Sequence, residues 1–287
     1  LILNIDTSTA VCSVALAKDG QTIALKENNE GLNHSVLLGT YVNEILQENN
    51  LTVAALDAVA VSMGPGSYTG LRIGVSMAKG LCYGAGKPLI AVPTLQALAL
   101  SVANQYQEEA LYCPMIDARR MEVYTAFYNR SNHTVIDTKA EIIDENSFAE
   151  LLATNVIYFF GNGSDKIKNT LTSPNARFIS GIETSARNLA PLAEQAWQNK
   201  QFVDVAYFEP FYLKDFVATT PKKKVLSSTK KQADENENIT VSINDSHTRS
   251  LQKRNKTHHQ RSQDHRNKIP MGNTFGTFCI FFQGSCH

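Results

Sequence analysis

A chain of 287 residues with 43% hydrophobic and 19% charged residues has the composition of a globular protein, and its length lies near the size at which one core divides into two lobes. No apolar run approaches the roughly 18 residues of a membrane helix, and the five cysteines have no paired spacing, so we expect a cytoplasmic protein without disulfides or a zinc site. The zero net charge conceals an acidic body, because residues 1–221 carry 15 basic and 22 acidic side chains, and such a body is a poor surface for bare nucleic acid.

The first half of the chain predicts three strands followed by helices that alternate with strands. Apolar runs at 1–5 and 11–17 and a third segment at 21–26, entered through an Asp19-Gly20 turn, have the pattern of a strand meander. An apolar stripe within 33–47 indicates a helix. The pattern then predicts, in order, a strand at 58–63, the turn Gly64-Pro65-Gly66, a helix from Ser67 to Ala85, a strand at 89–92 and a helix at 94–103.

The second half repeats this order more loosely. Its expected elements are strands at 111–117, 122–128 and 134–139, a helix at 147–153, strands at 156–160 and 177–180, and a helix at 185–197. Ile5-Asp6 is echoed by Ile116-Asp117, and the glycine turn at 63–67 is echoed at 160–164. A duplicated strand-strand-strand-helix-strand-helix unit is typical of the two-lobed, actin-like α/β fold, also called ASKHA or ribonuclease H-like. We predict lobes at 1–104 and 105–225.

The segment 226–287 has a different character. The chain beyond residue 221 holds 12 basic and 5 acidic residues, and most of it shows no apolar period, so we expect a disordered C-terminal tail. A short aromatic patch at 274–282 is either a peptide that docks on a partner or sequence read past the natural end of the gene. The second interpretation is favoured, because nothing in the patch fits the repeat.

The residues Asp6, Thr7, Ser8 and Thr9 occupy the place where actin-like ATPases hold their first phosphate loop. An equally good interpretation is that these side chains only satisfy the backbone of a hairpin turn. The second phosphate loop would come after Asp117, where Ala118-Arg119-Arg120 stand in place of glycines and would crowd a phosphate, although an arginine can itself bind one. A working ATPase is therefore disfavoured, and ATP or ADP is expected at most at a degenerate or shared site.

Small residues recur at every fourth position of the helix after the glycine turn: Gly70, Gly74 and Ala78. Such a stripe lets another element approach closely, and packing within one domain is the commoner reason for it. A contact between this helix, the helix at 33–47 and a second protein is the alternative. No nucleophile or metal site is indicated, because Ser67 is not in a hydrolase elbow and His34 and His133 lack acidic neighbours in sequence.

Several ordered motifs resemble the TsaB (YeaZ) family over residues 1–225. They are Ile5-Asp6-Thr7-Ser8-Thr9, His34-Ser35, the block from Gly64 through Gly74 to Leu81, Asp117-Ala118-Arg119-Arg120 with Glu122-Val123-Tyr124, and Pro210-Phe211-Tyr212-Leu213. The resemblance implies an actin-like subunit without transferase activity or cofactor of its own. Such a subunit pairs with its paralogue TsaD, which holds the metal and modifies the adenosine next to the tRNA anticodon, and the ATPase TsaE joins them.

The resemblance also implies site residues. In relatives the first two helices face TsaD, so the candidate partner-facing residues are Leu38, Tyr41, Val42, Ile45, Gly70, Leu71, Gly74, Met77, Ala78 and Leu81. Two metal-binding histidines of TsaD relatives correspond to Thr94 and Leu98, which cannot replace them. tRNA would be contacted through the complex, and a homodimer through the same helices is expected when TsaD is absent. A glycoprotease-like peptidase and a free-standing kinase of this fold are disfavoured alternatives.

Overall fold

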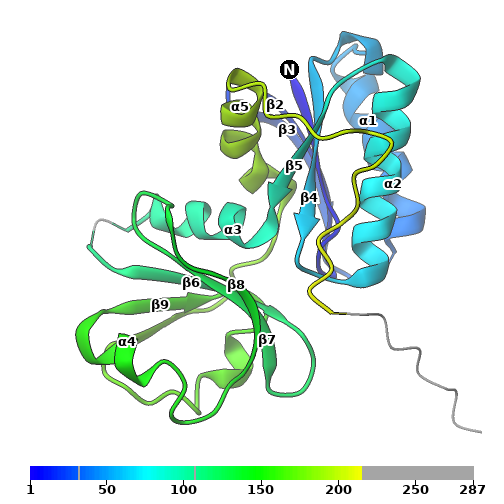
Figure 1. Cartoon of the computed structure of the whole chain (residues 1–287). Coiled ribbons are helices and arrows are strands. Elements are labelled where there is room, and N and C mark those ends of the chain that lie inside the picture. The colour runs from blue at the N-terminus through cyan, green and yellow to red at the C-terminus, as the bar shows by residue number, and fades with distance from the viewer. Residues whose placement is uncertain (32, 107, 215–287) are drawn as a thin grey trace, which may run out of the picture. The chain divides into compact units, whose positions relative to one another are not determined.

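A computed structural model of the chain describes residues 1–31, 33–106 and 108–214. The predicted tail at 226–287 lies outside these ranges. Figure 1 shows the described part as two sheets with helices packed against them. Within the described ranges, no helix is both long and apolar enough to cross a membrane.

The first sheet has five strands in the order β3-β2-β1-β4-β5. β1 is antiparallel to β2, to which a short turn joins it, and parallel to β4, which comes after β2, β3 and a helix in the chain. The strands are β1 (Ile2–Asp6), β2 (Cys12–Lys18), β3 (Gln21–Asn28), β4 (Ala58–Gly64) and β5 (Leu89–Pro93). β1 and most of β2 and β4 are buried, which explains their nearly continuous apolar sequence.

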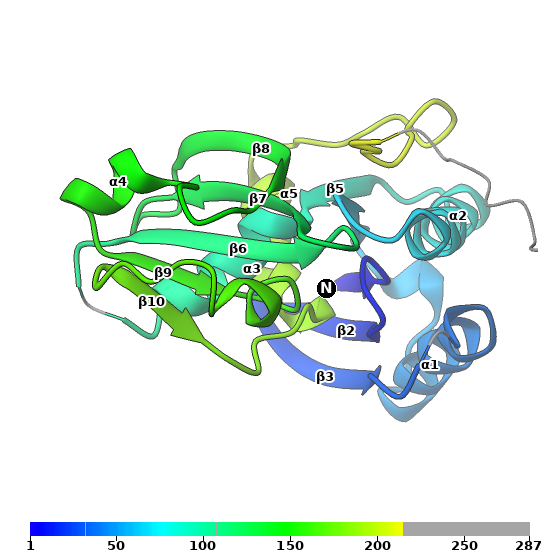
Figure 2. The ribbon, with the colours of Figure 1, turned by 90° about the horizontal axis from the view of Figure 1, so that it is seen from below.

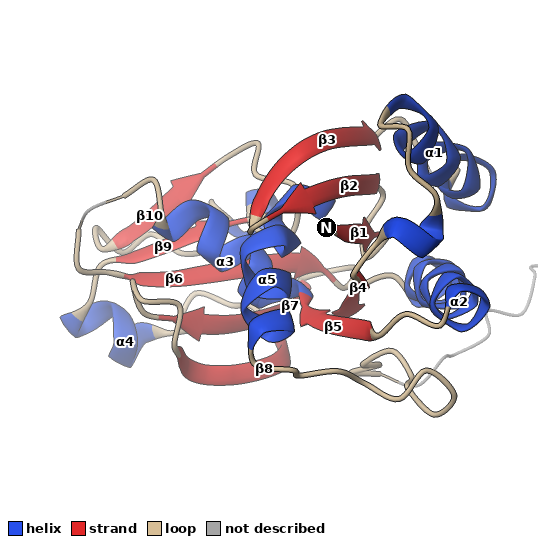
Figure 3. Ribbon diagram, turned by 90° about the horizontal axis from the view of Figure 1, so that it is seen from above, coloured by secondary structure: helices blue, strands red, loops and turns tan. Residues whose placement is uncertain are grey.

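Two helices, α1 (His34–Glu48) and α2 (Tyr68–Ala85), lie side by side against this sheet (Figures 2 and 3). α2 begins where the Ser67 hydroxyl caps the Gly70 amide at 3.3 Å. It ends at Gly86, whose φ of 62° is the left-handed conformation that glycine adopts without strain. The core between helices and sheet includes Leu3, Ile5, Leu16, Leu38, Ile45, Val61 and Val75.

The second sheet repeats the first in topology, with strand order β10-β9-β6-β7-β8 (Figure 2). Its strands are β6 (Leu111–Asp117), β7 (Glu122–Tyr128), β8 (Thr134–Ile142), β9 (Ile157–Phe160) and β10 (Ala176–Ile179). The helix between β8 and β9 is short, α4 (Ala149–Thr154), and the segment after β9 forms only the 3-10 turn η2 (Asp165–Ile167). The predicted duplication is confirmed, although the helices of the second unit are much reduced.

Each half of the chain contributes a helix to the sheet of the other half. α3 (Thr94–Ala103) packs on β6, where Leu95, Leu98 and Val102 share a core with Tyr112. The second half returns through the 3-10 turn η3 (Ala186–Leu189) and α5 (Ala190–Gln198), which pack on β1 and β5 (Figures 1 and 3). A boundary between residues 104 and 105 therefore separates the sheets but not the helices, and the predicted domain limits stay a prediction.

The described chain ends with a strap, residues 203–214, that runs back along the first sheet and α2. Val203 makes a bridge to Leu89, and the Phe211 amide donates to the Met63 carbonyl at 2.7 Å. The Lys79 ammonium on α2 donates to the carbonyls of Ala206 and Phe208 at 3.1 and 3.0 Å. These bonds fix α2 against the closing segment.

Candidate functional site

The turn after β1 holds a buried carboxylate. Oδ1 of Asp6 accepts hydrogen bonds from the Ser8 amide at 2.9 Å, the Ser8 hydroxyl at 2.6 Å and the Ser62 hydroxyl at 2.9 Å. Burial raises the pKa of Asp6, and the bonds from Ser8 and Ser62 oppose that shift. The carboxylate is thus engaged by its own turn and by β4.

The start of α2 closes over the same turn. A Cβ atom at Gly66 would lie 2.2 Å from the Ser8 carbonyl oxygen, and one at Gly70 would lie 2.0 Å from the Thr7 carbonyl oxygen. The Thr7 hydroxyl donates to the Gly70 carbonyl at 2.7 Å. The Thr9 and Thr184 hydroxyls lie 2.7 Å apart. The polar groups of residues 6–9 are therefore largely used inside the chain, and nucleotide binding at this turn stays a prediction.

The turn after β6 is open to solvent by contrast. Oδ1 of Asp117 accepts from the Arg119 amide at 2.8 Å and pairs with the Lys166 ammonium, and the Asp117 side chain is 48% exposed. Arg119 and Arg120 have φ values of 74° and 52°, in the left-handed region that disfavours side chains. Both arginines lie at the surface.

The small-residue stripe of α2 faces the chain's own first sheet. A Cβ atom at Gly74 would lie 2.3 Å from the Thr7 hydroxyl oxygen, and Ala78 is fully buried. The partner-facing interpretation is therefore wrong for seven residues, because they are buried in the first lobe: Leu38, Val42, Ile45, Gly70, Leu71, Gly74 and Ala78. Tyr41, Met77 and Leu81 are partly exposed and stay predictions.

A groove lies on the outer side of these helices. Its volume is about 700 Å³, and it is lined by Ser35 of α1 and by Thr69, Arg72, Ile73, Ser76, Met77, Gly80 and Leu81 of α2. The Met77 methyl group would lie 3.7 Å from a Cβ atom at Gly39, so α1 and α2 touch beside the groove. Ile73, Met77 and Leu81 have helical spacing and give the groove an apolar wall.

The similarity of this chain to known proteins is consistent between sequence and structure. A family model described as "TsaD: tRNA N6-adenosine threonylcarbamoyltransferase" matches residues 29–263. The tRNA threonylcarbamoyladenosine biosynthesis protein TsaB of Escherichia coli is 32% identical over 226 residues, which cover 76% of this chain and 96% of that protein. This chain belongs to the TsaB (YeaZ) family.

Similarity to two further proteins supports the same family assignment. The Bacillus subtilis protein of the same name is 39% identical over 131 residues, which cover 46% of this chain and 56% of that protein. The structure of YeaZ from Pseudomonas aeruginosa has a TM-score of 0.64 and 28% identity, and the match covers 74% of this chain and 99% of that chain. The actin-like α/β fold predicted from the duplicated pattern is confirmed.

Thr94 and Leu98, the positions for which the family resemblance predicts metal-binding histidines in TsaD relatives, are packing residues in this chain. The Thr94 hydroxyl accepts from the Gly64 amide at 3.1 Å, and Leu98 is buried in the core under α3. In the part of the chain that the structure describes, no three His, Cys, Asp or Glu side chains are grouped to hold a metal ion. Nε2 of His34 lies 3.1 Å from the Val11 carbonyl oxygen, and His133 is exposed.

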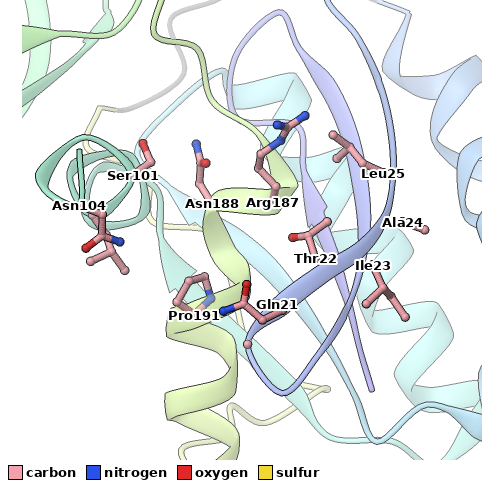
Figure 4. Close-up of a pocket in the computed structure, with 12 residues that line it drawn as sticks. Gln21, Thr22, Ile23, Ala24, Leu25, Ser101, Asn104, Arg187, Asn188 and Pro191 are labelled. Atoms are coloured by element: carbon pink, nitrogen blue, oxygen red, sulfur yellow. The ribbon is translucent and has the colours of Figure 1, made fainter.

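A pocket of about 560 Å³ with a mixed polar and apolar lining lies between β3, α3 and η3 (Figure 4). Gln21, Ser101, Asn104 and Asn188 line it, and Arg187 pairs with Glu27 at 3.2 Å. Amides and hydroxyls of this kind can bind a polar group but supply neither an acid nor a base. No sequence signal marks the pocket, because its lining comes from three elements far apart in the chain.

Proposed function

We propose that this chain is a noncatalytic subunit that binds the TsaD paralogue and supports threonylcarbamoyl transfer to the adenosine next to the tRNA anticodon. The names of its relatives, tRNA threonylcarbamoyladenosine biosynthesis proteins, support a role in this tRNA modification. The same role would place the protein in the cytoplasm, with the ATPase TsaE as a further partner.

The groove between α1 and α2 is the observation that carries the proposal. It is open, has an apolar wall of Ile73, Met77 and Leu81, and lies on two helices whose other faces are fixed in the core. An exposed apolar surface on a rigid scaffold is typical of a protein interface. Val36 on α1 is a further exposed apolar side chain, with 71% of its surface accessible.

The noncatalytic part of the proposal rests on the residues at the positions where this fold could hold a reaction centre. Asp6 is engaged by Ser8 and Ser62, Asp117 is paired with Lys166, and Thr94 and Leu98 offer no imidazole. A peptidase would need an activated nucleophile, and a kinase would need two open phosphate loops. Neither alternative gains support from these contacts, and ATP or ADP is proposed at most at a site shared with the partner.

The test is light scattering coupled to size-exclusion chromatography of the full chain mixed with the TsaD paralogue from the same organism. We expect a one-to-one complex, and we expect Met77→Glu to weaken it at least tenfold, because the carboxylate would be buried in the apolar groove. Val135→Glu is the matched control, since Val135 is 48% exposed on β8, away from both helices.

Absence of a complex between two folded proteins would contradict the proposal. Equal weakening by Met77→Glu and Val135→Glu would move the interface away from the groove. The chain alone should form a homodimer that Met77→Glu also weakens, because the same groove would then be covered by a second copy. Gly74→Leu is unsuitable for this test, because a side chain there would collide with Thr7 inside the lobe.

A further inference from the structure

The turn between β6 and β7 gathers cations from three separate parts of the chain. Lys166 of η2 pairs with Asp117 and donates to the Glu122 carbonyl at 2.6 Å, and Lys214 of the strap pairs with the Glu122 carboxylate. Arg119 and Arg120 form the tip of the turn. We call Arg119, Arg120, Lys166 and Lys214 the basic turn cluster.

The cluster has a net positive charge after its internal pairs are counted. Lys166 neutralises Asp117 and Lys214 neutralises Glu122. Among the described residues, no carboxylate pairs with the side chains of Arg119 or Arg120, so two guanidinium groups face solvent. An excess of positive charge is unusual within residues 1–221, since this part of the chain carries seven more acidic than basic side chains.

An aromatic ring lies within the same cluster. Tyr124 is half-buried on β7, two residues from Glu122 and therefore on the same face of the strand, the face where Lys214 pairs with the Glu122 carboxylate. Cations beside an accessible aromatic ring are a combination that RNA-binding surfaces use, because phosphates pair with the cations and bases stack on the ring.

The backbone of the turn gives an independent reason to look for a role of the arginines. Both have left-handed φ values, 74° and 52°, where glycine is free of strain and a side chain costs on the order of 1 kcal/mol or more. Their side chains do not repay that cost by packing, because both are exposed. A binding role for the guanidinium groups would account for them.

We propose that the basic turn cluster binds the phosphodiester backbone of tRNA in the complex with the paralogue. The inference rests on the proposed function and deepens it, because it gives this subunit its own contact with the RNA. Arginine is suited to the task, since its planar guanidinium can hold two phosphate oxygens at once. On a body of negative charge, one positive turn would also orient the RNA, because the surrounding surface repels it.

The experiment measures the affinity of an unmodified tRNA transcript for the complex of the full chain and its paralogue, by fluorescence anisotropy at low and moderate salt. Arg119→Gly with Arg120→Gly should weaken binding roughly tenfold and reduce the slope of log affinity against log salt by about 1.5, as expected for two lost phosphate contacts. Arg119→Lys with Arg120→Lys should keep most of the affinity. Lys200→Gly is the matched control, because Lys200 is also an exposed cation with a positive φ, 54°, but lies outside the cluster.

Stability separates a binding role from a structural one. Glycine relieves the left-handed strain, so the double glycine variant should unfold at a denaturant concentration close to that of the wild type while its tRNA affinity falls. Unchanged affinity and salt slope in that variant, within an intact complex, would overturn the inference and leave the proposed function standing.

Two further outcomes also support or contradict the inference. If no complex forms, the proposed function fails, and the same variants are compared for tRNA binding by the chain alone, where loss of binding in the double glycine variant supports the cluster and unchanged binding overturns it. A nucleotide is the competing source of phosphate. Loss of ATP binding with unchanged tRNA binding in the double glycine variant would assign the cluster to a nucleotide and contradict the RNA proposal.

Discussion

The turns after β1 and β6 are equivalent in the duplicated fold, and a glycine from the turn after β4 or β9 approaches each of them in the same way. Gly66 approaches the Ser8 carbonyl so closely that a Cβ atom would lie 2.2 Å from its oxygen, and Gly163 approaches the backbone of Ile116 and Asp117, with a Cβ atom 2.9 and 3.0 Å from their nearest atoms. An amide closes each contact, from Ser67 to Ser8 at 2.7 Å and from Gly163 to Met115 at 3.0 Å. The glycine turns that repeat in the sequence therefore make equivalent backbone contacts in the structure.

The segments after the two glycine turns differ in length, and this difference determines whether the neighbouring aspartate is buried or exposed. The 18-residue helix α2 comes after the first turn and seals Asp6 in the interior, where it is 2% exposed. Only the three-residue η2 comes after the second turn, and Asp117 stays at the surface beside Lys166. One duplicated loop has thus become part of a core, and the other has remained available to bind a ligand.

The largest expected effect comes from breaking the seal on the first turn. Gly70→Ala places a methyl group 2.0 Å from the Thr7 carbonyl oxygen. Because the Cβ atom and the carbonyl oxygen are both attached directly to the backbone, no side-chain rotation relieves the overlap, and we expect a loss of about 3 kcal/mol or more in the free energy of unfolding. Gly80→Ala on the same helix is the control, because nothing lies within 4 Å of a Cβ atom there. That change should stabilise the protein by about 0.5–1 kcal/mol through helix propensity.

Urea unfolding of both variants provides the comparison. Equal stabilities for the two alanine variants would mean that α2 does not seal the first turn as tightly as described.

A smaller loss is expected at the second turn. Gly163→Ala brings a methyl group to 2.9–3.1 Å from the backbone of Met115, Ile116 and Asp117, a milder overlap than the 2.0 Å at Gly70, so we expect a loss of about 1–2 kcal/mol in the free energy of unfolding. Gly66→Ala at the sealed turn should cost more than this. Thermal or urea unfolding of the pair would contradict the comparison if Gly163→Ala proved the more damaging change.

The sequence alone predicts only part of the difference between the buried turn at Asp6 and the exposed turn at Asp117. Strand order, the echoed glycines and both aspartates can be derived from apolar patterning and turn residues. The direction of the α2 stripe cannot, because Gly70, Gly74 and Ala78 on one face and Ile73, Met77 and Leu81 on another are both consistent with burial. Helical periodicity shows which residues share a face, but only packing shows that the glycine face is the inner one.

The exchange of α3 and α5 between the two sheets is a long-range feature for the same reason. Periodicity identifies an apolar face on each helix but does not show which sheet that face packs on. The basic turn cluster also combines three segments that are far apart in the chain. The sequence motif Asp117-Ala118-Arg119-Arg120 predicts the arginines of the cluster, but no sequence pattern predicts that Lys166 and Lys214 lie beside them.

The smallest expected effect distinguishes the two aspartates by pH. Because burial raises the pKa of Asp6, the folded state holds the proton more tightly than the unfolded state, so stability from this group is present at low pH and is lost as pH rises through the folded-state pKa. Asp6→Asn removes that loss and keeps an oxygen to accept from Ser8 and Ser62. The stability of this variant relative to the wild type should therefore increase from about pH 4, the usual value for an aspartate, and then level off. Urea unfolding between pH 4 and pH 8 measures the difference, and a relative stability that fell with rising pH would show that the bonds from Ser8 and Ser62 outweigh burial. Asp117→Asn is the control at pH 7, where loss of the exposed pair with Lys166 should change stability by less than about 1 kcal/mol.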